Sequence, residues 1–383
     1  MNSRERILTT VARREPDRVP FDLGSTVVTG IHVRPAEALR SHLGLPARDT
    51  VIFDLIEQAA VVEDDLADRL GVDARAVYAN PPSTWRFEPM EDGPYRYYTD
   101  EFRIRWRMPV EDGLYYDFAS HPLAGDCTLE DVDRFPWPDA TDAARFVGMR
   151  ERAERIAYVE RRATVAPTIG SGLMDTAAFL RGFEDFYADL AGNPALAGKL
   201  MDRVLEMKVA YWTRVIDECG PALDFVCEGD DLGSERGPLM SPGTYRSLVK
   251  PRHRELLDYI HSRGVKVLFH CCGGIRPLIG DLIEVGVDAL NPVQVSAAGM
   301  DSAELKAEFG QELAFWGGGI DTQRVLGVGT EADVRAEVRR RLDDFMPGGG
   351  FVFNAVHNIQ ANVPPEHVVA MWETVREYGS YNT

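Results

Sequence analysis

Short apolar segments alternate with helical segments along most of this chain, and no other feature of the sequence limits the fold as strongly. Eight segments have the length and composition of buried strands: residues 19–23, 75–79, 163–169, 224–228, 265–270, 288–293, 313–316 and 350–355. Helical periodicity predicts helices over residues 3–14, 35–43, 50–70, 176–190, 194–219, 242–262 and 330–345. Eight strands separated by helices favour an α/β fold of the (β/α)8 type, a TIM barrel, over an open doubly wound sheet. We expect residues 1–383 to form one such domain.

Residues 83–124 interrupt this alternation. Aromatic and charged residues alternate there around two Asp-Gly pairs, Asp92-Gly93 and Asp112-Gly113, and this pattern is typical of antiparallel hairpins. We therefore predict a hairpin insertion in the barrel. Its aromatic side chains either line a ligand cleft or form a small core of their own.

The predicted strand at 265–270 ends in a group of residues suited to chemistry. Side chains two positions apart on a strand point to the same side, so His270 and Cys272 share a face while Cys271 points the opposite way. An imidazole and a thiolate together suit zinc. The alternative is a buried, hydrogen-bonded histidine beside a packed cysteine.

Other strands bring polar side chains to the same end of the predicted barrel, where the active sites of this fold lie. Glu228, Asp230 and Asp231 are candidate catalytic carboxylates, acting as general base, metal ligand or the acceptor that orients a histidine. The alternative is a solvated acidic loop or a helix cap. His357 follows the last strand and is either a third metal ligand or a buried core histidine. The candidate substrate-binding residues at the remaining strand ends are Asp22, Asn291, Gln294, Asp321 and Asn358.

Composition argues against several functional classes. The formal charge of −19 disfavours nucleic acids and anionic membranes as partners. The chain starts with a charged segment, and no run approaches the ~18 apolar residues of a membrane span, so we expect a cytoplasmic protein. We find neither a dinucleotide-binding G-x-G-x-x-G with its acidic residue nor a P-loop. The five cysteines are too few, and odd in number, for a disulfide framework, and they favour free thiols or metal ligands.

A series of motifs, in order along nearly the whole chain, resembles the uroporphyrinogen decarboxylase superfamily. They are EPDRVP at 15–20, GDDLG at 229–233, SP at 241–242 with Tyr245, KP at 250–251, FHCCG at 269–273, GVDALNPV at 286–293, GGGID at 317–321, GGGF at 348–351, HNIQ at 357–360 and PPE at 364–366. The chain is most similar to the branch that contains zinc-dependent methyltransferases of corrinoid pathways. The resemblance independently implies the (β/α)8 barrel that the strand count favours.

The two best-known activities of this superfamily use different residues. The decarboxylases hold the eight carboxylates of their substrate with an arginine-rich segment of the form R-Q-A-G-R, but this chain has DLGST at 22–26 and no arginine cluster there. The methyltransferase branch binds zinc through H-x-C and a distant cysteine. His270 and Cys272 match the first two ligands, and His357 stands where the resemblance implies the third.

The resemblance therefore implies a zinc enzyme that accepts a methyl group on a thiol from a methylated corrinoid, a cobalamin presented by a partner corrinoid protein. Three alternatives remain open: a lyase acting on an aromatic or pyrrolic carboxylic acid, direct demethylation of a small methylated compound with folate as acceptor, and a non-enzymatic role in a corrinoid pathway. For the oligomeric state, a homodimer is one option.

Overall fold

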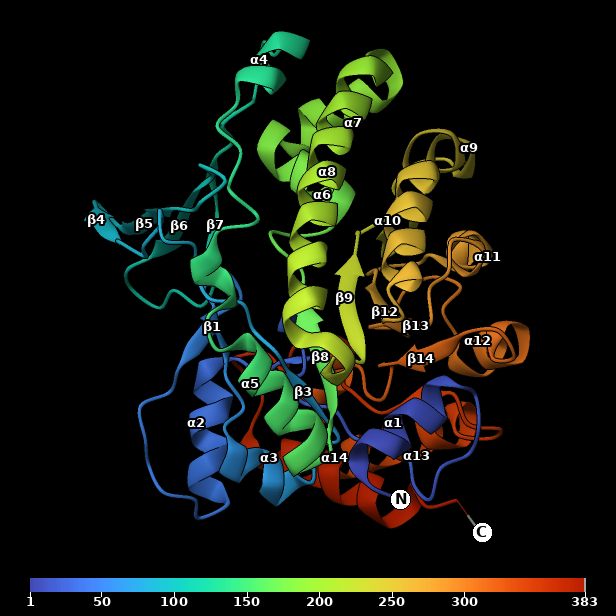
Figure 1. The fold of residues 1–383 in the computed structure, drawn as a ribbon. Helices are drawn as coiled ribbons and strands as arrows, with labels where there is room; N and C mark the ends of the chain where they lie inside the picture. The colour runs from blue at the N-terminus through green and yellow to red at the C-terminus, as the bar shows by residue number, and fades with distance from the viewer. Residues whose placement is uncertain (382–383) are drawn as a thin grey trace.

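The computed structural model of the protein describes residues 1–381, and its centre is a curved sheet of seven parallel strands (Figure 1). In their spatial order the strands are β3 (Ala74–Ala76), β8 (Ala163–Pro167), β9 (Phe225–Gly229), β12 (Lys266–His270), β13 (Ala289–Asn291), β14 (Ala314–Trp316) and β15 (Phe351–Val352). Nearly all their side chains are buried, as in a sheet covered on both faces. Seven of the predicted strands are thus confirmed, with ends shifted by a few residues.

Residues 19–23, predicted as the first strand, close the sheet into a barrel. The N–H of Phe353 donates to the carbonyl of Pro20, and the N–H of Asp22 donates back to the carbonyl of Phe353, each at 2.9 Å. On the other side, the N–H of Asp73 donates to the carbonyl of Phe21 at 2.8 Å. The segment therefore lies between β15 and β3, which gives the TIM-barrel arrangement that the sequence predicted.

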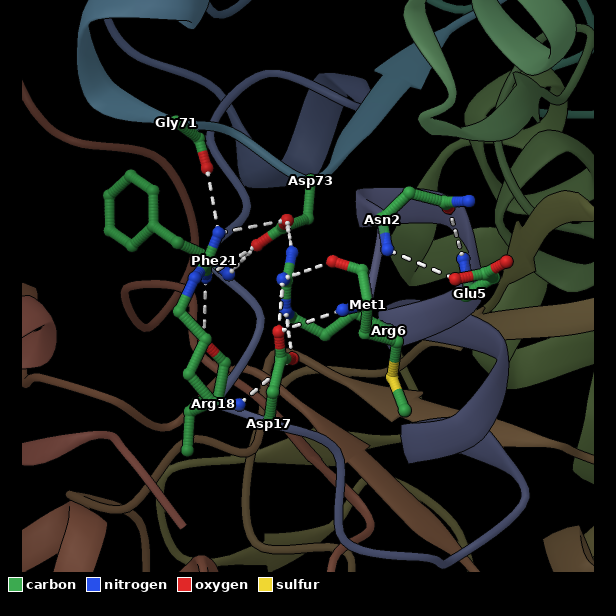
Figure 2. Close-up of polar contacts among 10 residues, drawn as sticks. Met1, Asn2, Glu5, Arg6, Asp17, Arg18, Phe21, Gly71 and Asp73 are labelled. Carbon is green, nitrogen blue, oxygen red and sulfur yellow. Dashed lines mark hydrogen bonds and ion pairs between the residues drawn. The ribbon is translucent and has the colours of Figure 1, made fainter. Parts of the chain in front are cut away.

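A buried carboxylate secures this closure (Figure 2). Asp73, which precedes β3 and is fully buried, accepts the N–H of Phe21 at 2.8 Å. It also accepts hydrogen bonds from Arg6 at 2.7 Å and from Arg18 at 2.8 Å. Arg6 binds Asp17 at 2.7 Å in addition. One cluster of charges thus joins the first helix, the closing segment and β3.

The helices form the outer layer of the barrel (Figure 1). They are α1 (Ser3–Val11), α2 (Val33–His42), α3 (Asp64–Leu70), α4 (Leu129–Arg134), α5 (Met149–Glu154), α6 (Leu173–Arg181), α7 (Phe183–Gly192), α8 (Pro194–Cys219), α9 (Pro242–Thr244), α10 (Lys250–Ser262), α11 (Arg276–Glu284), α12 (Ser302–Phe309), α13 (Glu331–Phe345) and α14 (Pro365–Tyr378). Helix α1 is the exception to this layer, because its Ile7 and Val11 pack into the interior core with Val165 and Leu268. Among residues 1–381, no helix is both long and apolar enough to cross a bilayer.

The predicted helix over residues 50–70 is wrong in its first half. A hairpin of β1 (Ile52–Asp54) and β2 (Ala59–Ala60) precedes the shorter helix α3. The turn is stabilised locally, because Asp54 Oδ1 accepts the N–H of Glu57 at 2.6 Å. Gln58 has a φ of 51°, in the left-handed region where a right-handed helix cannot continue. The hairpin also binds residues 31–33 through backbone hydrogen bonds.

Two further predicted helices are interrupted. The region 176–190 contains α6 and α7, which are separated at Gly182, where φ is 86°. The region 242–262 contains α9, a π-helical turn at Tyr245–Val249, and α10. Pro251 has no N–H to donate, so the regular helical pattern is broken just before it.

The predicted hairpin insertion is present as an antiparallel sheet of four strands, β4 (Met90–Asp92), β5 (Tyr95–Thr99), β6 (Arg105–Pro109) and β7 (Asp117–Ser120). Its aromatic residues mainly form a core of their own. Tyr98 and Trp106 are buried, and the Trp106 ring lies 4.3 Å from that of Phe118, which in turn contacts Phe179 on α6. Tyr115, between β6 and β7, instead lines a cavity at the carboxyl end of the barrel.

Loss of Asp73 should destabilise the whole barrel. We expect Asp73→Ala to lower the free energy of unfolding by ~3–5 kcal/mol, because it leaves two arginines and a backbone N–H without their buried partner. Urea unfolding followed by circular dichroism measures this change. The exposed Asp92, on the insertion, provides the control, and equal stability of Asp73→Ala and Asp92→Ala would contradict the role given to Asp73.

Candidate active site at the carboxyl end of the barrel

His270 ends β12, and Cys272 follows two residues later on the same side. The Sγ atom of Cys272 lies 3.4 Å from Nε2 of His270. His357, which follows β15, joins them, so that one ligand atom from each of the three residues lies within 4.8 Å of the others. The structure therefore brings together the three residues that the sequence proposed as metal ligands.

Asn291 fixes the orientation of the His270 ring. The two residues are paired across β12 and β13, and His270 Nδ1 lies 2.7 Å from Asn291 Oδ1. The Asn291 Nδ2 group donates to the carbonyl of Trp316 at 2.8 Å, so Oδ1 must face the histidine. His270 Nδ1 is then the donor, and the lone pair of the neutral ring is on Nε2, toward Cys272. Asn291, proposed from sequence as a substrate-binding residue, thus orients a candidate ligand.

His357 is held differently. Its backbone has a φ of 64°, a left-handed conformation that costs energy for a non-glycine residue and is enriched at functional sites. Burial first, and then neighbouring His270, lowers the pKa of His357 to about 4, so the ring is neutral at neutral pH. Its Nδ1 accepts the N–H of Asn358 at 2.8 Å. A neutral imidazole has one nitrogen with a lone pair and one that carries the proton. If Nδ1 binds the metal, its lone pair is used there, and if Nε2 binds the metal, Nδ1 carries the proton. In either case the ring loses the hydrogen bond from Asn358.

The environment of Cys272 favours a cation. Burial first, and the Asp231 carboxylate second, raise the pKa of the Cys272 thiol well above its ordinary value. The thiol is therefore protonated at neutral pH unless a positive charge binds beside it. Cys271 points away from this group, as predicted from strand alternation, and its Sγ accepts the N–H of Leu232 inside the apolar core.

The three proposed catalytic carboxylates have different surroundings. Glu228 is 2% exposed and lies against α8, where its carboxylate binds Lys208 at 2.9 Å and Trp212 at 2.6 Å. Asp230 is fully buried, and its Oδ2 lies 2.5 Å from His253 Nε2 on α10. Both carboxylates are buried and hydrogen-bonded to neighbouring elements, and neither lines the cavity.

Asp231 lies beside the candidate ligands. Its Oδ1 accepts the N–H of Cys272 at 2.8 Å and lies 3.8 Å from His270 Nε2. Its side chain is 48% exposed, so it also faces solvent. Of the three proposed carboxylates, only this one is positioned to act on the cluster directly.

The remaining predicted substrate-binding residues differ in their access to substrate. Gln294 lines the cavity, and its Oε1 accepts the N–H of Gly273, whose φ of 91° forms the turn after Cys272. Asp321 is buried and caps the helical turn that begins at Thr322. Asn358 is buried and accepts the N–H of Gly30 at 2.6 Å, and its Nδ2 has no hydrogen-bond partner.

Asp22 lies inside the barrel. It is 1% exposed, and its Oδ2 accepts hydrogen bonds from Ser25 Oγ at 2.6 Å and from Trp316 Nε1 at 2.8 Å. Burial raises the pKa of Asp22 to about 6 despite these bonds. It is not among the residues that line the cavity beside Cys272 and His357.

A cavity of about 680 Å³ opens beside the cluster. Its lining residues are Glu57, Leu114, Tyr115, Cys272, Gln294, Thr322, Gln323, Val356, His357, Gln360, Ala361 and Asn362. Glu57 was missed because its segment was predicted to be helical. Asp54, Glu57 and Gln58 interrupt an otherwise apolar stretch over residues 51–62, and these polar positions are the sequence signal that would have indicated a turn there.

The donor set fits zinc. For tetrahedral zinc with ordinary Zn–N and Zn–S bonds, the edge between a nitrogen and a sulfur ligand is about 3.5 Å. The distance of 3.4 Å between His270 Nε2 and Cys272 Sγ agrees with that edge. Two neutral imidazoles and one thiol, with a carboxylate nearby, are also ligands that zinc accepts.

Comparison with known proteins identifies the family. The family model described as Uroporphyrinogen decarboxylase (URO-D) matches residues 122–378, which contain all three candidate ligands. The chain belongs to the uroporphyrinogen decarboxylase family. This membership confirms the resemblance seen in the motifs and places the protein among enzymes.

The individual relatives of this chain within the uroporphyrinogen decarboxylase family are distant in sequence. It is 28% identical over 287 residues to a uroporphyrinogen decarboxylase of Alkalilimnicola ehrlichii, covering 73% of each chain. It is 26% identical over 278 residues to the enzyme of the same name from Pseudomonas aeruginosa, covering 69% of this chain and 73% of the relative. A solved methyltransferase from Methanosarcina mazei shares the fold, with a TM-score of 0.65 over 99% of both chains at 18% identity.

Substitutions at the end of β12 should separate ligands from packing residues. We expect His270→Ala and Cys272→Ala each to abolish stoichiometric zinc, whereas Cys271→Ala keeps it because that side chain points into the core. Metal analysis of protein purified without chelator measures the zinc content. Equal metal loss in all three variants would contradict the assignment of faces.

Proposed function

We propose that this protein is a zinc-dependent methyltransferase that moves a methyl group between a corrinoid, or a small methylated substrate, and a thiol. The observation that carries this proposal is the convergence of His270, Cys272 and His357, two of which also line the cavity. Zinc held by these residues would act as a Lewis acid and lower the pKa of a thiol bound at its fourth position. The methyltransferase activity named for the Methanosarcina mazei protein of the same fold supports this proposal.

The residues around the cluster prepare it for this reaction. Asn291 holds the lone pair of His270 Nε2 toward the position that the three ligands share. Asp231 anchors the backbone of Cys272 and supplies negative charge beside it. The acceptor thiol and the methyl donor would meet in the cavity, and a partner protein would present a corrinoid donor at its mouth.

A carboxy-lyase is the second candidate, and the names of the curated relatives favour it. The charge of the cavity argues against uroporphyrinogen itself as the substrate. None of the described residues that line the cavity is arginine or lysine, and Glu57 adds a carboxyl group. A substrate with eight carboxylates needs cations to hold it. A lyase at this site would therefore act on a less acidic aromatic or pyrrolic acid.

The two candidate activities can be separated directly. We expect the zinc-loaded protein to consume methylcobalamin in the presence of 2-mercaptoethanol. The change in corrinoid absorption measures this consumption. We expect no turnover of uroporphyrinogen, because the cavity offers no cation for its carboxylates. Formation of coproporphyrinogen at about 1 per second or faster, an ordinary enzymatic rate, would overturn the methyltransferase proposal. The Cys272→Ala variant, which lacks one of the three candidate zinc ligands, serves as the control.

His357 should be the weakest of the three ligands. Because its ring must give up the hydrogen bond from Asn358, we expect His357→Ala to weaken zinc binding less than His270→Ala does. We expect His357→Cys to restore binding and to add one sulfur to the ligands counted by X-ray absorption. Full zinc with an unchanged set of ligands in His357→Ala would show that His357 is not a ligand, and Asp231 would replace it as the candidate.

A further inference from the structure

Glu57 shares the cavity wall with Cys272 and His357, yet the chemistry described above gives it no role. The β1–β2 hairpin places it there, because Asp54 Oδ1 holds the backbone N–H of Glu57 in the turn. The hairpin is itself fixed to the barrel by backbone hydrogen bonds to residues 31–33. The position of Glu57 is therefore built into the fold.

We infer that Glu57 is the proton acceptor of this site and takes the proton from the acceptor thiol. This inference rests on the proposed methyltransferase function. The S–H bond breaks and an O–H bond forms on the Glu57 carboxylate, which becomes a neutral acid. The thiolate sulfur then forms the S–CH₃ bond while the bond between the methyl group and its donor breaks, and the donor keeps that electron pair. Glu57 afterwards returns the proton to solvent.

The other carboxylates near the site are less suited to this step. Glu228 is bound to Lys208 and Trp212, and Asp230 is bound to His253, so both are occupied and buried. Asp231 holds the backbone of Cys272 and lies against the candidate ligands themselves. Glu57 is the only carboxylate among the described residues that line the cavity.

The surroundings of Glu57 adjust its proton affinity to this task. Burial first, and the Asp54 carboxylate second, raise the pKa of Glu57 to about 7, while Asn358 acts in the opposite direction. The titratable groups that act on it electrostatically are Asp54, Tyr115 and Asp231, and Cys272 and His357 line the same cavity. A general base with a pKa near the working pH is efficient, because it is ionised often enough to act and still holds the proton that it takes.

The test is the pH dependence of methyl transfer from methylcobalamin to 2-mercaptoethanol. Glu57 accepts a proton only when ionised, so for the wild-type protein kcat/KM should rise with pH as the Glu57 carboxyl group ionises. We expect Glu57→Gln to lower kcat/KM by about 10²-fold and to remove this rise, and Glu57→Asp to restore part of both. The isosteric glutamine keeps the backbone bond to Asp54 and should leave zinc content and thermal stability unchanged.

A second readout does not require methyl transfer. In the cobalt(II)-substituted protein, binding of 2-mercaptoethanol as a thiolate gives a charge-transfer absorption, and stopped-flow mixing measures how fast it appears. We expect Glu57→Gln to slow this binding above neutral pH, whereas Glu88→Gln, on the exposed surface of the insertion, leaves it unchanged.

The outcomes distinguish the two proposals. A wild-type protein that binds no metal or transfers no methyl group overturns the proposed function, and the role of Glu57 with it. An active wild-type protein whose Glu57→Gln variant keeps the same rate and the same pH profile overturns the role of Glu57 alone.

Discussion

The site depends on closure of the barrel, and closure depends on the buried carboxylate of Asp73. Residues 19–23 make only a few backbone hydrogen bonds with β15 and β3, so the side-chain bonds of Asp73 to Phe21, Arg6 and Arg18 supply much of the connection. His270 ends β12 and His357 follows β15, and two strands separate β12 from β15 in the sheet. They meet because the sheet curves into a barrel. A flat sheet of the same strands would hold them apart.

Most of the barrel could be predicted because strand and helix periods are local properties of the sequence. Each apolar run of about five residues, bounded by glycine or a polar turn, was placed within a few residues of a real strand. The relation between His270 and Cys272 was also predictable, because two residues on one strand share a face regardless of the rest of the fold. Their meeting with His357 was expected from the shared rim of a barrel, which follows from topology rather than from local sequence.

Other features depend on contacts that the sequence does not show. Strand β9 is buried on both faces, so its sequence alone could not reveal that Glu228 faces Lys208 on α8 while Cys227 faces the barrel interior. The segment 50–70 has enough apolar residues for a helix, but tertiary pairing with residues 31–33 selects a hairpin. That error hid Glu57, because side chains on a helix there would have had a different direction. Asn291 was identified as a polar residue at a strand end, but its role required knowing that it lies beside His270.

The side chains of the cluster differ from the H-x-C pair and distant cysteine that the methyltransferase resemblance implies, because His357 replaces the second cysteine. One thiolate and two neutral imidazoles would leave a zinc ion with a net charge of about +1, one unit more positive than a site with two thiolates. Asp231, 3.8 Å from His270 Nε2, places a carboxylate where it offsets part of that charge without occupying the position of His357. A more positive ion acidifies a bound thiol more strongly but leaves the thiolate a weaker nucleophile. Under the proposed function, such a site would suit a reactive methyl donor, with the Glu57 carboxylate in the same cavity as the base.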